Sequence, residues 1–442
     1  MSNTIKEVIE FVKENDVQFV RLAFSDLHGN QKNISVMAEE LPAAFKDGVS
    51  FDANAIKGFG GGAKSDLLLF PDPATLAVLP WRPGPGRVVR FFCDIKNPDG
   101  TIFTHDCRYL LKQVVTRCEK MGYVCKIGAE CEFYLFKTDE NGEPTNTTFD
   151  NGGYLDISPL DKGENIRREI CLALREMGIQ PETSHHEQGP GQNEIDFRFS
   201  DALSCADNLL TFKSVVKAVA MRNGLFASFM PKPIKNEPGN GMHVNISLNQ
   251  NGFNIFKNSR GEHSKTAESF IAGVLSKAQE LSLFLNPLAN SYERLGEFEA
   301  PKYATWSHQN RSQLIRIPAA DGERVRMELR SPDPAMNPHL GFALILSAGL
   351  DGIEAGLDLK PAVDLDLYTA DEVLLKALPQ LPQLPQTIDA AIALAEKSEL
   401  ARAVMGSELL LKYISAKKTE AAAFAKAESP EAFYNSNYFH VT

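Results

Sequence analysis

Four short stretches of the chain alternate between polar and apolar residues, and they constrain the fold more than any other feature. The clearest is residues 194–199, which read Glu-Ile-Asp-Phe-Arg-Phe; the others are residues 128–136, 242–248 and 324–330. A β-strand points successive side chains to opposite faces, so each stretch has one apolar and one polar face. One such strand is typical of a half-exposed antiparallel sheet. Four together predict a curved sheet whose concave face is a charged cleft.

The polar faces of these predicted strands gather an unusual set of carboxylates. Like charges two residues apart on one face raise each other's pKa unless cations compensate. Oxygen ligands with a single nitrogen suit Mg²⁺ or Mn²⁺ better than Zn²⁺. The candidate metal ligands are Glu130, Glu132, Glu187, Glu194, Glu328 and His243.

Several arginines accompany these acids, namely Arg294, Arg311, Arg316, Arg326 and Arg330. Two divalent ions beside guanidinium groups neutralise the charge that spreads over a transferring phosphoryl group. The combination therefore predicts phosphoryl-transfer chemistry. The adjacent His185 and His186 are not expected to be ligands.

The chain is long enough, at 442 residues, for two or three domains. Short strands with one helix at residues 4–14 predict a small mixed domain over residues 1–104. Residues 105–442 predict a large α+β domain. Its C-terminal part, in which Pro379, Pro382 and Pro385 precede two more helices, is expected to be a helical appendage.

Charge and cysteine usage exclude several classes of protein. The net charge of −11 without a basic block argues against nucleic acid and anionic membranes as main partners. No apolar run approaches the roughly 18 residues that span a bilayer. Seven scattered cysteines fit neither a disulfide framework nor a zinc site. With an amphipathic rather than signal-like N-terminus, these features predict a cytoplasmic protein.

A glycine-rich loop at residues 58–65 is similar to a phosphate-binding P-loop. Ala63 stands where that motif needs glycine, and the loop runs into a short strand that prolines end at residues 71–73. A P-loop must instead lead into a helix. The pattern therefore favours a surface loop.

Six groups of residues, in chain order, resemble the motifs of the type I glutamine synthetase family. They are residues 128–133, 184–187 with 191–195, 229–233, 241–244, 310–312 with 315–318, and 328–334. The resemblance covers roughly residues 16–360. It implies an α+β fold with an N-terminal β-grasp domain and a catalytic domain with a curved antiparallel sheet, of the glutamine synthetase/guanidino kinase type. It also implies a dodecamer of two hexameric rings, with each active site shared between neighbouring subunits.

The resemblance also implies roles for single residues, with ATP as co-substrate and two to three Mg²⁺ or Mn²⁺ ions per site. Glu132, Glu187 and Glu194 would hold one ion, and Glu130, His243 and Glu328 the other. The implied ATP-binding residues are Glu182, Asn245, Ser247, Arg311, Arg316 and Arg326. The implied glutamate-binding residues are Gly239, Arg294, Glu299, Arg311 and Arg330, and the implied catalytic residues are Asp52, Glu299, Arg311 and Arg330.

The reaction implied by the family has two steps. ATP phosphorylates the γ-carboxylate of glutamate, and ammonia then displaces phosphate to give glutamine. Asp52 of the neighbouring subunit would bind ammonium, and Glu299 would close over the acyl phosphate, which hydrolyses unless water is kept out.

Two alternatives stay open, and the first rests on positions that depart from the family pattern. Ala53 and Ala55 flank Asn54 where a serine is common, which could leave room for an organic amine in place of ammonia. Pro238 and Asn245 also replace commoner residues. The second alternative is a non-catalytic scaffold, which would have no need to keep all six metal positions.

Overall fold

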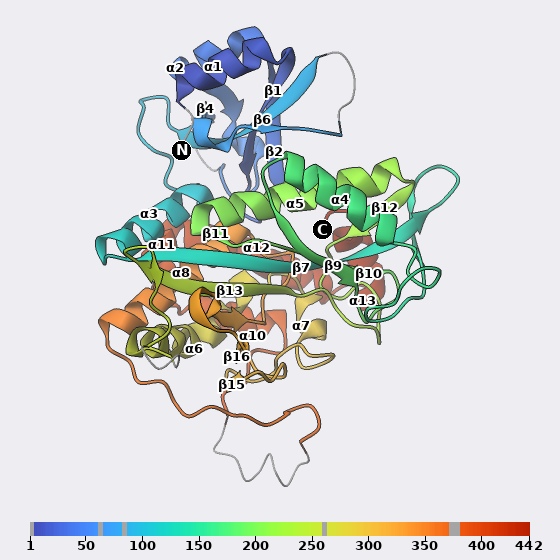
Figure 1. The fold of residues 1–442 in the computed structure, drawn as a ribbon, viewed down its shortest axis with the longest axis vertical. Coiled ribbons are helices and arrows are strands. Elements are labelled where there is room, and N and C mark those ends of the chain that lie inside the picture. Colours follow the sequence, from blue (N-terminus) through green and yellow to red (C-terminus); the bar gives the residue numbers. More distant parts are fainter. Residues whose placement is uncertain (1–3, 61–64, 82–85, 259–262, 371–380) are drawn as a thin grey trace.

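The computed structural model describes residues 4–60, 65–81, 86–258, 263–370 and 381–442. A smaller N-terminal part, blue in Figure 1, lies at one end of the long axis, and the larger remainder of the chain lies below it.

Of the glycine-rich loop at residues 58–65, positions 61–64 lie outside the described residues. The strand β4 follows this loop, where a P-loop would need a helix.

In its described residues, the N-terminal part has a six-stranded sheet and two α-helices. The strands run in the order β2-β1-β6-β4-β3, with β5 paired to β6. Their bounds are β1 Val17–Ser25, β2 Gln31–Met37, β3 Val49–Asp52, β4 Asp66–Pro71, β5 Ala77–Val78 and β6 Arg87–Lys96, and the helices are α1 Ile5–Glu14 and α2 Leu41–Asp47. The expected first helix is confirmed. It begins at a capping box between Thr4 and Glu7, and it buries Val8 and Val12.

The larger part is built on an eleven-stranded sheet, whose central order is β15-β16-β17-β13-β7-β10-β9. The strands are β7 Val124–Thr138, β8 Pro144–Thr148, β9 Pro181–His186, β10 Gln192–Phe197, β11 Ser200–Asp201, β12 Leu225–Ser228, β13 Met242–Gln250, β14 Phe253–Asn254, β15 Trp306–His308, β16 Ile315–Ile317 and β17 Met327–Leu329. The pairs are antiparallel except for β15 with β16, which are parallel. The sheet is therefore mixed at one edge rather than purely antiparallel.

Helices cover the apolar face of this sheet. Helices α3 Cys107–Lys120, α4 Glu164–Glu176 and α5 Ala202–Arg222 pack against its strands, and α8 Pro338–Glu354 packs against α3, α5 and α6 Lys265–Leu285. The short helix α7, Ser291–Arg294, instead brings Arg294 to the polar side. On β7, Cys131, Phe133 and Leu135 point into the core, and the Phe133 ring packs against Phe212 of α5. The alternation along β7 therefore leaves the Glu130 and Glu132 side chains on the opposite, polar face.

The C-terminal region differs from the sequence-based expectation of two helices in an appendage. Within the described residues 381–442 there are four α-helices: α10 Ile388–Ala395, α11 Glu399–Met405, α12 Ser407–Phe424 and α13 Pro430–Tyr434. Their apolar side chains join the main core, and the Phe439 ring lies 5.1 Å from that of Phe136 on β7. The region packs into the core because Ile388, Leu409 and Tyr438 present apolar surface to it.

The expected strand over residues 324–330 is also shorter in the structure. Only β17, Met327–Leu329, pairs with β13 and β16, and Gly322–Arg324 forms a 3₁₀ turn. The Asn254 side chain explains the difference, because its Nδ2 donates to the backbone oxygens of Glu323 (3.0 Å) and Val325 (2.7 Å). Those carbonyls are thereby held in a turn.

None of the helices in the described ranges is long and apolar enough to cross a membrane. All seven cysteines are free thiols, which confirms that they form no disulfide framework.

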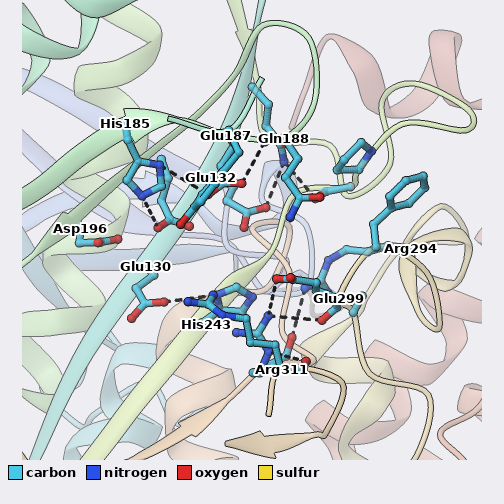
Figure 2. A pocket seen from close by; sticks show the side chains of 18 of the residues that line it. Glu130, Glu132, His185, Glu187, Gln188, Asp196, His243, Arg294, Glu299 and Arg311 are labelled. Carbon is cyan, nitrogen blue, oxygen red and sulfur yellow. Dashed lines mark hydrogen bonds and ion pairs between the residues drawn. The ribbon is translucent and has the colours of Figure 1, made fainter. Parts of the chain in front are cut away.

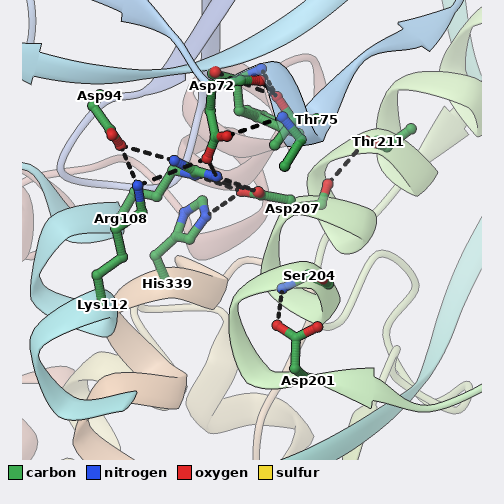
Figure 3. Close-up of polar contacts among 12 residues, drawn as sticks. Asp72, Thr75, Asp94, Arg108, Lys112, Asp201, Ser204, Asp207, Thr211 and His339 are labelled. Carbon is green, nitrogen blue, oxygen red and sulfur yellow. Dashed lines mark hydrogen bonds and ion pairs between the residues drawn. The ribbon is translucent and has the colours of Figure 1, made fainter. Parts of the chain in front are cut away.

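A buried charge cluster joins the two parts of the chain (Figure 3). Arg108, in the first turn of α3, is 3% exposed, and it donates from Nε and Nη2 to Asp207 of α5 at 3.1 and 2.9 Å. The same guanidinium reaches Asp94 and Asp72 of the N-terminal part, each at 2.9 Å. His339 adds a 2.8 Å contact to Asp207. The cluster fixes how the N-terminal part sits on the catalytic part.

Asp207→Asn should destabilise the protein at pH 7 by about 3–5 kcal/mol, because it breaks a buried ion pair. Burial alone would raise the Asp207 pKa, but Arg108 and His339 hold it well below its usual range. A depressed folded-state pKa gives stability that is present above about pH 4 and is lost as pH falls through the folded value. Urea unfolding of both proteins from pH 7 to pH 3 should therefore show the difference shrinking in acid. A difference that stays constant with pH would contradict this role.

Candidate active site

A cavity of about 580 Å³ lies over the polar face of the large sheet (Figure 2). A second cavity of about 500 Å³ adjoins it, and Glu130, Asp196 and Arg326 line both. The candidate residues that line the first cavity are Glu130, Glu132, Glu187, Glu194, Gly239, His243, Arg294, Glu299, Arg311, Arg316, Arg326 and Arg330. Those that line the second include Glu182, Asn245 and Ser247.

One group of potential metal ligands sits where β7, β10 and β9 lie side by side. Strand register places Glu194 opposite Glu132 on one side and opposite His185 on the other. His185 lies between two acids, with Nδ1 3.5 Å from Glu187 and Nε2 3.4 Å from Glu194. Ligand atoms of His185, Glu187 and Glu194 all lie within 4.8 Å of one another, as do those of Glu132, Glu194 and His243. The sequence pattern left His185 outside this group, and the structure brings it in.

The second group forms where β7, β13 and β17 meet. His243 pairs with Glu130 across the sheet, and Nδ1 of His243 lies 3.3 Å from Glu130 and 3.9 Å from Glu328. Possible ligand atoms of these three residues again lie within 4.8 Å. Glu328 is fully buried between the guanidinium groups of Arg316 and Arg330, both of which donate to it.

Burial and charge crowding raise the pKa of the carboxyl groups in this site and lower that of the imidazole. Burial, followed by the charge of Glu187, raises the pKa of Glu132 to about 8. Burial and the neighbouring Asp196 raise the pKa of Glu194 well above its usual range. Burial and Arg330 lower the pKa of His243, which keeps the imidazole neutral with a lone pair to donate. A divalent ion would relieve the repulsion among these carboxylates.

The arginines are held in place by backbone carbonyls. Arg294 donates to the backbone oxygens of Ser331 (2.8 Å) and Arg330 (3.1 Å). Arg330 is 1% exposed and donates from Nε to the backbone oxygen of Arg311 at 3.0 Å. Rigid guanidinium groups at a cavity wall suit bidentate recognition of carboxylate or phosphate.

Glu299 lies in a loop whose residues 298–300 line the first cavity. Its backbone φ is +66° and that of Phe298 is +44°, which is the left-handed region that residues other than glycine rarely adopt. A carboxylate oxygen of Glu299 lies 3.8 Å from Arg330. Such strain is typical of loops whose conformation serves a function.

Asp52 lies apart from these residues. It ends β3 in the N-terminal part, where its carboxylate accepts the Asn54 N–H at 2.9 Å, and it does not line either cavity. A single chain therefore does not bring Asp52 to the other candidate residues.

Sequence reasoning missed several residues of the two cavities, among them Tyr154, Gln192, Asp196 and Phe199. Asp196 shares the polar face of β10 with Glu194, so the alternation of the strand could have found it. Burial and Glu130 raise its pKa to about 7. Tyr154 comes from a loop with no such pattern.

Two family descriptions match the chain in sequence order. "Glutamine synthetase, beta-Grasp domain" matches residues 16–98, and "Glutamine synthetase, catalytic domain" matches residues 104–436. The chain belongs to the glutamine synthetase family. The expected α+β fold, a β-grasp part followed by a catalytic part with a curled sheet, is thereby confirmed.

Relatives and solved structures agree with this membership. The chain is 45% identical to a glutamine synthetase of Clostridium saccharobutylicum over 94% of this chain and 95% of the relative. It is 44% identical to that of Methanosarcina mazei over 94% of each chain. Among solved structures, a GmaS/ADP complex superposes with a TM-score of 0.87 at 31% identity, covering 99% of both chains. Plasmodium falciparum glutamine synthetase gives 0.85 at 26% identity, with the same coverage.

Proposed function

We propose that this chain ligates ammonia to the γ-carboxylate of L-glutamate at the cavity on the polar face of the sheet. ATP first phosphorylates the carboxylate, and ammonia then displaces phosphate, giving glutamine, ADP and phosphate. The observation that carries the proposal is that five of the six candidate metal ligands line one cavity with buried arginines, while the sixth, Glu328, lies buried beside Glu130 and His243. Relatives named glutamine synthetase, 41–45% identical over nearly the whole chain, favour ammonia over an organic amine and an enzyme over a scaffold.

Two to three Mg²⁺ or Mn²⁺ ions fit this site, because the donors are carboxylates with one neutral imidazole. Glu132, Glu187 and Glu194 would hold one ion, and the second group, Glu130, His243 and Glu328, would hold the other. When bound, such ions polarise phosphoryl oxygens and neutralise their charge. His185, between Glu187 and Glu194, completes the surroundings of the first ion.

The second cavity suits the nucleotide, with Glu182, Asn245 and Ser247 on its wall. Arg326 reaches both cavities, and its Nε donates to Asn245 Oδ1 at 2.7 Å. The γ-phosphate would then lie at the junction, where Arg326 meets the first cavity. Arg311, Arg316 and Arg330 line that cavity and would stabilise the transferring phosphoryl group.

Glutamate occupies the other side of the first cavity. Arg294 and the Gly239 backbone would orient its α-carboxylate and α-amino group, and its γ-carboxylate would point toward the two ion sites. Glu299 closes over the acyl phosphate and keeps water away from it.

Asp52 acts in the neighbouring subunit's site, where it binds ammonium and helps to deprotonate it. Its distance from the cavity of its own chain supports a shared site, and we place the enzyme in a dodecamer of two hexameric rings. Seven free cysteines suit a reducing, cytoplasmic compartment.

Product analysis tests the proposed reaction directly. The protein is incubated with Mg²⁺, ATP and glutamate, together with ammonia or one of a panel of primary amines, and the products are weighed by mass spectrometry. We expect glutamine, ADP and phosphate at turnover numbers on the order of 1–10³ s⁻¹. Faster formation of a γ-glutamyl amine would overturn ammonia as the substrate, and the absence of ADP would overturn the ligase itself.

A further inference from the structure

Gln192 is a buried amide at the floor of the first cavity. It is the first residue of β10, lies opposite Tyr134 on β7, and is 1% exposed. It is neither a candidate metal ligand nor a charged group. Its position between the metal-binding acids and the glutamate side of the cavity nevertheless gives its side chain contacts to both.

The Gln192 carboxamide joins three separate segments. Nε2 donates to Glu132 Oε2 and to the backbone oxygen of Gly239, both at 3.1 Å, and Asn240 Oδ1 lies 3.3 Å away. Oε1 accepts the N–H of Gly189, in the Gly-Pro-Gly turn, at 3.0 Å. One side chain thus connects a metal-binding acid of β7, the loop at 238–241 and the turn between Glu187 and Glu194.

Glu132 is bound to the same loop a second time. The Gly241 N–H donates to Glu132 Oε2 at 2.7 Å, so both donors meet one carboxylate oxygen. In the described part of the chain, no hydrogen bond reaches Glu132 Oε1. This arrangement orients the carboxylate so that Oε1 is the oxygen available to an ion.

The loop has little room to adjust if these contacts are lost. A Cβ at Gly239 would meet the Pro231 oxygen at 2.4 Å, and a Cβ at Gly189 would meet the Tyr134 hydroxyl at 2.0 Å. Tyr134 Oη also donates to the Pro238 oxygen at 2.6 Å. The backbone at 238–239 is therefore held from one side by Tyr134 and from the other by Gln192.

We propose that Gln192 is a positioning residue that couples the orientation of the metal-binding Glu132 to the glutamate-binding backbone at Gly239. The inference rests on the proposed ligase function. An amide suits this position because it donates to a carboxylate and a carbonyl while accepting a backbone N–H. A glutamate would place a second anion against Glu132, and an apolar side chain would leave the half-buried carbonyl of Gly239 without this donor.

Gln192→Met removes the amide at nearly constant volume and tests this coupling. We expect the KM for glutamate to rise by roughly 10-fold or more and Mn²⁺ affinity to fall by roughly 10–100-fold, while the KM for ATP changes by less than about twofold. Steady-state kinetics with each substrate and Mn²⁺ titration calorimetry measure the three quantities. Gln180→Met, at an exposed site just before β9, makes the same chemical change and should alter none of them.

Tyr134→Phe separates the effect on the glutamate-binding backbone from the effect on Glu132. It removes the donor to Pro238 without touching Glu132, so it should raise the KM for glutamate and leave Mn²⁺ affinity within about twofold of wild type. Circular dichroism reports whether Gln192→Met folds. If it does not, Tyr134→Phe still tests the importance of the contact to the loop at 238–241. Equal changes in both KM values, or an unchanged KM for glutamate in either variant, would overturn the inference. A wild-type protein that forms no glutamine would instead overturn the proposed function.

Discussion

Replacing Glu194 with glutamine should abolish formation of the acyl phosphate while leaving the fold intact. Glu194 is 7% exposed, faces Glu132 and His185 across the sheet, and has a pKa raised well above its usual range by burial and by Asp196. Its charge is therefore unfavourable in the metal-free protein, and a bound cation would favour it. Removing one of three carboxylates from an ion should lower turnover by at least about 10³-fold, because several kcal/mol of charge stabilisation are lost.

Hydroxylamine trapping provides the measurement, since it intercepts an acyl phosphate as a hydroxamate before ammonia is involved. The Glu194→Gln protein should give no hydroxamate, should show a smaller rise in melting temperature with Mn²⁺ than wild type, and should melt no lower than wild type without metal. Glu176→Gln, at the exposed end of α4, makes the same substitution away from the site and should behave as wild type. Hydroxamate formation that survives in Glu194→Gln would remove Glu194 from the ligand set.

The polar faces of the strands could be predicted from the sequence because a strand has a period of two. That period assigns Glu130 and Glu132 to one face of β7, and Glu194 and Asp196 to one face of β10. It also places His185 on the same face as Glu187, whereas the contact of His185 with Glu194 depends on the register between β9 and β10. His186 then points the other way, where it is fully buried with its Nε2 2.8 Å from Asp150.

Strand register and long-range contacts could not be predicted in the same way. Nothing in the local pattern indicates that Glu130 pairs with His243, 113 residues later, or that Asn254 holds the backbone at 323–325 in a turn. The Arg108 cluster likewise depends on partners from β6, α5 and the segment after β4. Such contacts arise from tertiary packing. The family resemblance, and not the periodicity of the strands, indicated which of these distant residues would come together.

Asp52 offers the sharpest test of how the active site is assembled, because the structure keeps it away from the cavity of its own chain. Asp52→Ala and Glu194→Gln should each be inactive as pure proteins. When the two are co-expressed and assort at random, a site is intact if its catalytic part comes from the Asp52→Ala chain and its N-terminal part from the Glu194→Gln chain. About one quarter of the sites in a ring of neighbours meet both conditions, so about one quarter of wild-type activity should return.

The matched control pairs two defects in the catalytic part, Glu194→Gln and Glu328→Gln. Glu194 lines a cavity that a single chain forms, and Glu328 lies buried beside that cavity. Every site in this mixture would therefore keep one of the two defects, and activity should not return. Recovery in the first mixture and its absence in the second would require Asp52 to act across a subunit boundary. If neither mixture recovers activity, Asp52 does not complete a neighbour's site. The loss of activity in Asp52→Ala would then have to arise within its own chain, through the turn that its carboxylate caps at Asn54.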